Sequence, residues 1–297
     1  MYDIYVPLVD NTDIKLPFAE AFNLVIEGLA PLGEGYKNLL KKGLADGWID
    51  VCENEGKRSG AYATGVYDTH PYVLLNYQET TNDIFTVAHE MGHAIHTYKS
   101  NETQPYAKAD YTIFLAEIAS TVNEVLLLKH LYKKTDDKNL KKYLLNYYMD
   151  TIRATLFRQT QFAEFEQIAH AKAEAGEALT KESLNAVYYD LNKQYFGDGI
   201  THNEQIAYEW ARIPHFYNSF YVYKYATGII AAISIVKRIL TEGQPAVDDY
   251  FKFLSSGGKT DPVTILKQAN VDLTSKAPFE AAMEEFRATL EEFKSLL

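Results

Sequence analysis

The chain has 297 residues, of which 47% are hydrophobic and 23% are charged, and its formal net charge is -11 at pH 7. A chain of this length can bury a large core, whereas its acidity argues against a nucleic acid partner, whose phosphates need a basic surface. The single cysteine, Cys52, excludes an intrachain disulfide and favours a reducing compartment. We find neither a membrane-spanning apolar run nor a signal-peptide pattern, so we expect a cytoplasmic protein that does not enter membranes.

Helical patterns dominate the chain, and short strand patterns cluster near its beginning. Apolar runs predict strands at residues 3–8, 49–53, 61–67 and 72–77. Helical periodicity predicts helices at residues 17–46, 81–99, 111–134, 137–175, 181–195, 215–240, 245–254 and 279–296. Because no linker-like stretch and no repeat interrupts these patterns, we predict one mainly α-helical domain with a small β-sheet over residues 1–297.

The residues His89, Glu90, Met91, Gly92 and His93 form an HExxH motif in the predicted helix at 81–99. Positions four apart share one face of an α-helix, so His89 and His93 can direct two imidazole nitrogens at one metal ion. Glu90 lies beside that face, where its carboxylate can reach a metal-bound water. In a chain with 8 histidines and 40 acidic residues, this pattern arises by chance roughly 0.03 times. The alternative is an amphipathic helix with two unrelated histidines.

A third ligand is expected from the predicted helix at 111–134. That helix is apolar apart from a few residues, and Glu117, Thr121 and Glu124 fall on one of its faces. A carboxylate in an apolar helix is costly unless it is paired or bound to a metal. We therefore predict Glu117 as a metal ligand and Glu124 as an acceptor for the N–H of a ligating histidine. The alternative is that both glutamates line a solvated groove.

Four segments together resemble oligoendopeptidase F, within the thimet-oligopeptidase-like family of zinc metallopeptidases. They are GKRSGAYATGVYDTHPYVLLNY at 56–77, HEMGHAIH at 89–96, FLAEIASTVNE at 114–124 and IPHFYNSFYVYKYATG at 213–228. The resemblance implies a zincin-like catalytic domain in which His89, His93 and Glu117 bind one Zn²⁺ ion and Glu90 is the general base. Family members are longer than this chain, which resembles their catalytic C-terminal half. Their N-terminal helical half is therefore expected to be absent here.

Residues 215–225 combine a histidine with a cluster of aromatic side chains, for which core packing is the usual explanation. Tyrosine predominates in the cluster, and a buried tyrosine hydroxyl needs a polar partner. The resemblance implies that a histidine and tyrosines of this segment stabilise the oxygen that becomes negative in the transition state. We predict His215, Tyr221 and Tyr223 as catalytic residues, with Tyr225 as the competing tyrosine.

These expectations combine into a zinc-dependent endopeptidase that hydrolyses peptide bonds in short oligopeptides. Zinc would activate a water molecule, and Glu90 would take the proton of that water as the general base. The alternative is a zinc-containing peptide-binding module with little or no catalysis, since the resemblance covers only the C-terminal half of the family. The preferred peptide bond and the oligomeric state do not follow from the sequence.

Overall fold

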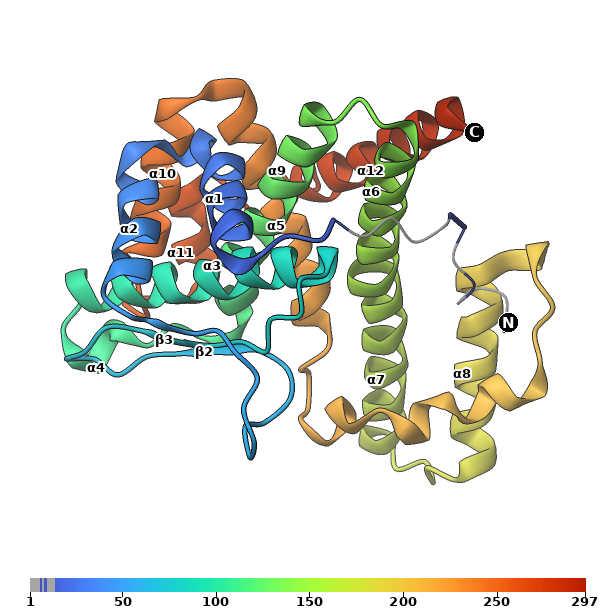
Figure 1. The fold of residues 1–297 in the computed structure, drawn as a ribbon. Helices are drawn as coiled ribbons and strands as arrows, with labels where there is room; N and C mark the ends of the chain where they lie inside the picture. Colours follow the sequence, from blue (N-terminus) through green and yellow to red (C-terminus); the bar gives the residue numbers. More distant parts are fainter. Residues whose placement is uncertain (1–5, 7, 10–13) are drawn as a thin grey trace. The chain divides into compact units, whose positions relative to one another are not determined.

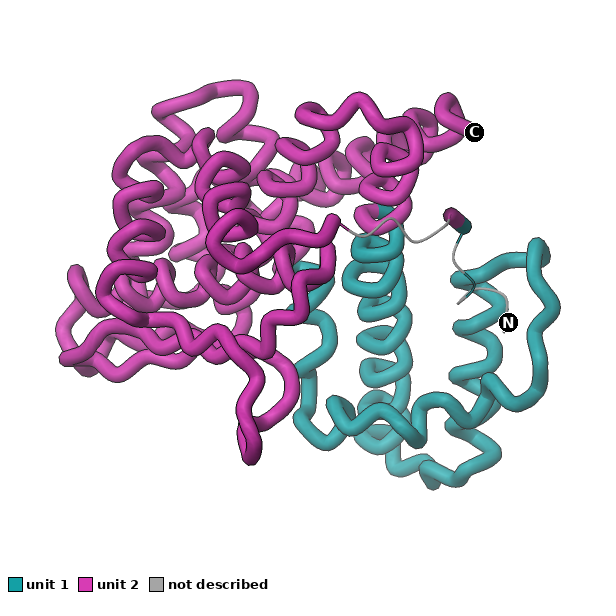
Figure 2. Tube along the Cα trace, viewed as in Figure 1, with its two compact units in different colours: residues 1–8, 149–227 teal, residues 9–148, 228–297 magenta. Residues whose placement is uncertain are grey.

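The computed structural model describes residue 6, residues 8–9 and residues 14–297, and the chain divides into two compact units (Figures 1 and 2). We call residues Val9–Tyr148 and Gly228–Leu297 the sheet unit, and residues Met1–Leu8 and Met149–Thr227 the helical unit. The chain is mainly α-helical with a small β-sheet, as predicted. The strand predicted at 3–8 lies largely outside the described residues. The single catalytic domain over residues 1–297 stays a prediction.

The sheet unit contains the β-sheet and most of the helices. Its elements are α1 (Phe18–Gly28), η2 (Ala30–Leu32), α2 (Gly33–Ala45), β1 (Ile49–Asp50), β2 (Tyr62–Thr64), β3 (Tyr72–Leu74), α3 (Thr81–Thr103), α4 (Tyr106–Ala109), α5 (Ile113–Lys134), most of α6 (Lys138–Ile152) and α9 (Tyr223–Glu242), α10 (Gln244–Leu254), α11 (Pro262–Leu266), η7 (Lys267–Ala269) and α12 (Ala277–Leu296). The strand order is β1-β3-β2, with β1 parallel and β2 antiparallel to β3. All three strands were predicted, but each is shorter because only two or three of its residues pair with a neighbour.

Helices α3 and α5 contact each other along much of their length in the sheet unit, and α3 also packs against β2 and β3. Helix α3 begins with a capping box, in which the Thr80 hydroxyl accepts from the Asp83 N–H and the Asp83 carboxylate accepts from the Thr80 N–H. Thr80 is therefore the N-cap of α3, and the helix starts at Thr81 as predicted. Ala88 contacts Asn123 and Gly92 contacts Ser120, so the two helices run antiparallel.

Two predicted helix boundaries are wrong. The helix predicted at 17–46 is divided into α1 and α2 by the short η2, whose second residue, Pro31, has no N–H with which to continue α1. The helix predicted at 215–240 begins only at Tyr223, because Phe220 has a φ of 57° and cannot be part of a right-handed helix. Among the described residues, no helix is long and apolar enough to span a bilayer.

The helical unit is built around α7 and α8. Its elements are the end of α6, the π-helical η3 (Arg153–Phe157), α7 (Arg158–Glu174), α8 (Lys181–Phe196), η4 (Gly197–Gly199), η5 (Glu204–Arg212), η6 (Pro214–Tyr217) and the start of α9. Gly176, with a φ of 77°, follows the C-cap residue Ala175 and ends α7. The core of the unit is an aromatic and aliphatic cluster formed by Phe162, Phe165, Tyr188, Leu191 and Val222.

Candidate functional site

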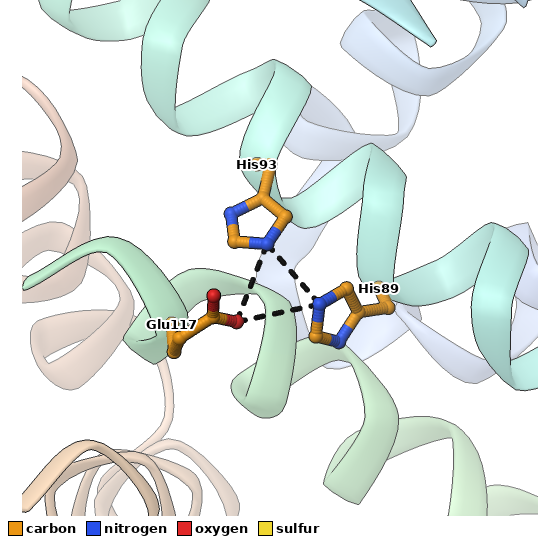
Figure 3. A group of neighbouring side chains, drawn as sticks. All are labelled: His89, His93 and Glu117. Carbon is orange, nitrogen blue, oxygen red and sulfur yellow. Dashed lines mark hydrogen bonds and ion pairs between the residues drawn. The ribbon is translucent and has the colours of Figure 1, made fainter. Parts of the chain in front are cut away.

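Three side chains of the sheet unit direct donor atoms at one point (Figure 3). His89 and His93 project from α3, and Glu117 projects from α5. His89 Nε2 lies 3.1 Å from His93 Nε2, and Glu117 Oε2 lies 3.3 Å from each of these two nitrogens. The spacing of four residues places both imidazoles on one face of α3, and the antiparallel α5 supplies the carboxylate. The structure thus brings the three residues predicted as ligands together.

The donor types and their separations fit a small divalent metal ion. Two imidazoles and one carboxylate form a known donor set of catalytic zinc sites. Donors about 2.0–2.1 Å from a metal at tetrahedral angles are about 3.3–3.4 Å apart, close to the separations seen here. Calcium would need about six to eight oxygen ligands at about 2.3–2.6 Å, which this nitrogen-rich set does not supply. The cluster of His89, His93 and Glu117 could therefore hold one metal ion.

Glu124 orients His89 from the side away from the donor triangle. His89 Nδ1 donates a hydrogen bond to Glu124 Oε1 at 2.5 Å, which is the contact predicted for this glutamate. A proton on Nδ1 leaves the Nε2 lone pair available to a metal. Burial lowers the pKa of His89, but hydrogen bonds to Glu117 and Glu124 outweigh burial and raise the pKa to about 10. Burial likewise raises the pKa of Glu117, yet its bonds to His89 and His93 hold that pKa well below its usual range.

Glu90 is buried beside the donor triangle. Glu90 is only 6% exposed, and its Oε2 has no hydrogen-bond partner within the described part of the chain. Burial raises the pKa of Glu90 above its ordinary value, although the nearby His89 and His93 oppose that shift. A carboxylate held in this way suits proton transfer, because its pKa moves toward neutrality.

Sequence reasoning missed the amide that joins α3 to α5. Asn123 Nδ2 donates to the carbonyl oxygen of Ala88 at 2.9 Å, and Asn123 Oδ1 accepts from the Tyr36 hydroxyl at 2.8 Å. Ala88 directly precedes His89, and Asn123 directly precedes Glu124. The hydrogen bond from the Asn123 side chain to Ala88 therefore fixes the register of α3 against α5 at the contact between His89 and Glu124.

Sequence reasoning also gave no role to Ser120, whose hydroxyl lies 3.0 Å from the Glu117 carbonyl oxygen and 3.1 Å from Glu117 Oε2 and can donate to either. Oε2 is the Glu117 oxygen that faces the two histidines. The signal for Ser120 and Asn123 was present, because both are polar residues inside an apolar helix. The cost of burying an unpaired polar group, which identified Glu117, applies equally to them.

His96 follows the HExxH motif on α3 but is a core residue. It is 1% exposed, and its ring stacks on Tyr111 with centroids 3.7 Å apart. Neither ring nitrogen has a hydrogen-bond partner among residues 14–297. Burial lowers the pKa of His96 to about 3, so the folded protein keeps this imidazole neutral.

We expect acid to destabilise the fold through His96. In the unfolded chain this side chain takes up a proton below about pH 6.5, whereas in the folded protein it does so only near pH 3. The free energy of unfolding should therefore fall by up to about 1.4 kcal/mol for each pH unit between these values. Urea unfolding of the parent and of His96→Phe from pH 7 to pH 4.5 measures this contribution to the free energy of unfolding. That free energy should fall more steeply with falling pH in the parent than in His96→Phe. Equal dependence on pH in the two proteins would contradict a buried, neutral His96.

The helical unit brings His215 together with two tyrosines. The ring centroid of His215 lies 5.6 Å from that of Tyr221 and 5.9 Å from that of Tyr225, and the two tyrosine rings are 5.7 Å apart. The Tyr225 hydroxyl lies 3.4 Å from His215 Nε2. Tyr223 instead lines a cavity of about 440 Å³ with Glu166 and other residues of the helical unit. The catalytic roles of His215, Tyr221 and Tyr223 stay predictions, but Tyr225 is the tyrosine grouped with His215 and Tyr221.

Comparisons with known proteins agree with the resemblance seen in the four sequence segments. The chain is 50% identical over its full length to oligopeptidase PepF of Bacillus subtilis and 45% identical to an oligoendopeptidase F homolog of Lactococcus lactis, of which it covers 44% and 49%. The crystal structure of oligoendopeptidase-F from Enterococcus faecium aligns with the whole chain at a TM-score of 0.75 and 35% identity, and 46% of that protein is covered. The chain thus spans about half the length of these relatives. The profile of Peptidase family M3 matches residues 5–285, and the chain therefore belongs to peptidase family M3.

Proposed function

We propose that the chain is the catalytic part of a zinc-dependent endopeptidase that hydrolyses peptide bonds in short oligopeptides. The observation that carries this proposal is the donor triangle of His89, His93 and Glu117, with the buried Glu90 beside it. Three donors leave one position of a tetrahedral zinc site for water or substrate, which is typical of catalytic rather than structural zinc. The names of the relatives, oligopeptidase and oligoendopeptidase, support peptides as the substrate class.

Each residue of the site has a distinct role in this proposal. A zinc ion, when bound, supplies a Lewis acid that lowers the pKa of water and polarises the scissile carbonyl. Glu90 accepts the proton of the attacking water and then delivers a proton to the leaving amine. Glu124 keeps the proton of His89 on Nδ1, so that Nε2 stays a ligand.

The edge of the sheet offers a place for an extended peptide. Strand β2 lies at one end of the strand order, and it packs against α3, which carries the HExxH motif. An extended substrate can add to such an edge through main-chain hydrogen bonds. Asn76 donates from Nδ2 to the carbonyl oxygens of Arg58 and Gly60, both at 2.9 Å, and so shapes the loop before β2. Gly60 and Asn76 also line a cavity of about 260 Å³ next to this loop.

For the oxyanion we propose His215 and Tyr221, with Tyr225 preferred to Tyr223. Tyr225→Phe and Tyr221→Phe should each lower kcat by about 10²-fold with little change in KM, because a lost donor acts on the transition state. Tyr223→Phe is the matched control and should stay near the parent rate. Steady-state kinetics on one fluorogenic peptide compares the three variants. A larger loss of kcat in Tyr223→Phe than in Tyr225→Phe would instead assign oxyanion stabilisation to Tyr223.

Metal removal tests the proposed function as a whole. We expect hydrolysis of a fluorogenic oligopeptide by the zinc-loaded chain, loss of that activity with a chelator, and recovery after zinc is restored. Mass spectrometry of the digest identifies the bonds that are cut. Peptide binding without chelator-sensitive cleavage would instead support the alternative of a peptide-binding module. This alternative is considered because the chain spans only about half the length of its relatives.

A further inference from the structure

The turn before α9 has an unusual backbone conformation at Phe220. This residue has a φ of 57°, which a bulky side chain rarely adopts. The turn is closed by a hydrogen bond of 3.1 Å from the Tyr221 N–H to the Asn218 carbonyl oxygen. A conformation of this kind persists only where its surroundings hold it, and such conformations cluster at functional sites.

The chain on either side of the turn is fixed by packing, whereas the turn itself is exposed. Phe216 packs against the core cluster of the helical unit, and Val222 is part of that cluster and only 1% exposed. Between them, Tyr217 is 90% exposed and Phe220 is 48% exposed. Burial of apolar surface therefore does little to determine the conformation of the turn.

Helix α7 holds the turn at two points. The Phe220 N–H donates to Glu166 Oε1 at 2.7 Å, and the Phe220 ring lies on the ring of His170 with centroids 4.6 Å apart. Glu166 and His170 are four residues apart, so they share one face of α7. Glu166 is only 5% exposed, so water competes little for its hydrogen bond with the Phe220 N–H.

We propose that Glu166 is a positioning residue for the groups that stabilise the oxyanion. By accepting the Phe220 N–H, it holds the turn that sets the place of Tyr221, whose ring contacts those of His215 and Tyr225. This inference rests on the proposed function, since it assigns Glu166 to the same reaction.

Three single variants separate the hydrogen bond from the charge and from general effects on α7. Glu166→Met removes the acceptor but keeps the length of the side chain, whereas Glu166→Gln keeps an acceptor and removes the charge. Glu164→Met is the matched control, because Glu164 lies two residues earlier on α7 and accepts from the Tyr195 hydroxyl at 2.9 Å. We expect Glu166→Met to lower kcat by about 10²-fold with KM and zinc content near the parent. The other two variants should stay close to the parent rate.

Hydrogen exchange read by mass spectrometry gives a measurement that does not depend on turnover. Exchange in the peptide covering residues 217–223 should be faster in Glu166→Met and unchanged in Glu164→Met. Unchanged exchange in Glu166→Met, or equal kinetic losses in Glu166→Met and Glu164→Met, would overturn the proposal. A Glu166→Gln variant as slow as Glu166→Met would also overturn it, in favour of a role for the charge. A parent chain without turnover would refute the proposed function, and the exchange result would still decide whether Glu166 holds the turn.

Discussion

Glu90→Gln is expected to retain zinc and to lose turnover. Glutamine has nearly the shape of glutamate, but its amide cannot accept the proton of the attacking water, so kcat should fall by at least about 10²–10⁴-fold. Glu90 is not one of the three donors of the triangle, so zinc affinity should stay near that of the parent. Fluorogenic peptide kinetics and zinc content, measured on the same preparation, test both parts of this prediction.

Two further variants give the Glu90 experiment its controls. Glu102→Gln changes an exposed glutamate on α3 that pairs with Lys99, and it should leave both activity and zinc content unchanged. Glu117→Gln changes a proposed ligand and should lower zinc affinity together with activity. A Glu90→Gln variant that hydrolyses peptides at the parent rate would contradict the assignment of Glu90 as the general base. Loss of zinc in Glu90→Gln would show that this carboxylate contributes to metal binding.

The predicted contacts of the metal cluster depend on local periodicity, and this is why the sequence reveals them. The four-residue spacing of His89 and His93 fixes their common face once α3 is helical. Glu117 and Glu124 are seven residues apart on α5, so both can reach His89 in the antiparallel partner helix. Polar residues inside an apolar helix need partners, so the two glutamates of α5 point to the histidines of α3 as those partners.

The features that were not predicted depend on tertiary contacts. Phe220 adopts a positive φ because Glu166 and His170 of α7 hold it, and nothing near Phe220 in the sequence indicates that conformation. This turn delays the start of the helix predicted at 215–240 to Tyr223 and determines which tyrosines group with His215. A regular helix over residues 215–225 would place Tyr221 and Tyr225 on one face and Tyr223 on another. The segment is instead a short 3-10 helix, a turn and the start of α9, so helical spacing alone does not describe how its side chains group.

Gly92→Ala is expected to weaken both the fold and the metal site. A Cβ at this position would lie 2.6 Å from the Cα of Ser120 and 2.7 Å from the carbonyl oxygen of Ala119. Both are backbone atoms of α5, so no side-chain rotation can relieve the clash. Such overpacking costs about 1–3 kcal/mol of folding stability, whereas alanine in place of glycine normally favours a helix.

The same substitution couples stability to metal binding, because Gly92 lies next to His93 on α3 while Glu117 lies on α5. Any separation of the two helices lengthens the 3.3 Å distances from Glu117 Oε2 to the histidine nitrogens. Zinc affinity, measured by competition with a chromophoric chelator, should therefore fall together with the urea midpoint. Gly35→Ala is the matched control, because its Cβ would come no closer than 4.0 Å to the ring of Phe251. It should raise stability by about 0.5 kcal/mol and leave zinc affinity unchanged. If Gly92→Ala matched the parent in both measurements, the spacing of the donors would not depend on this backbone contact.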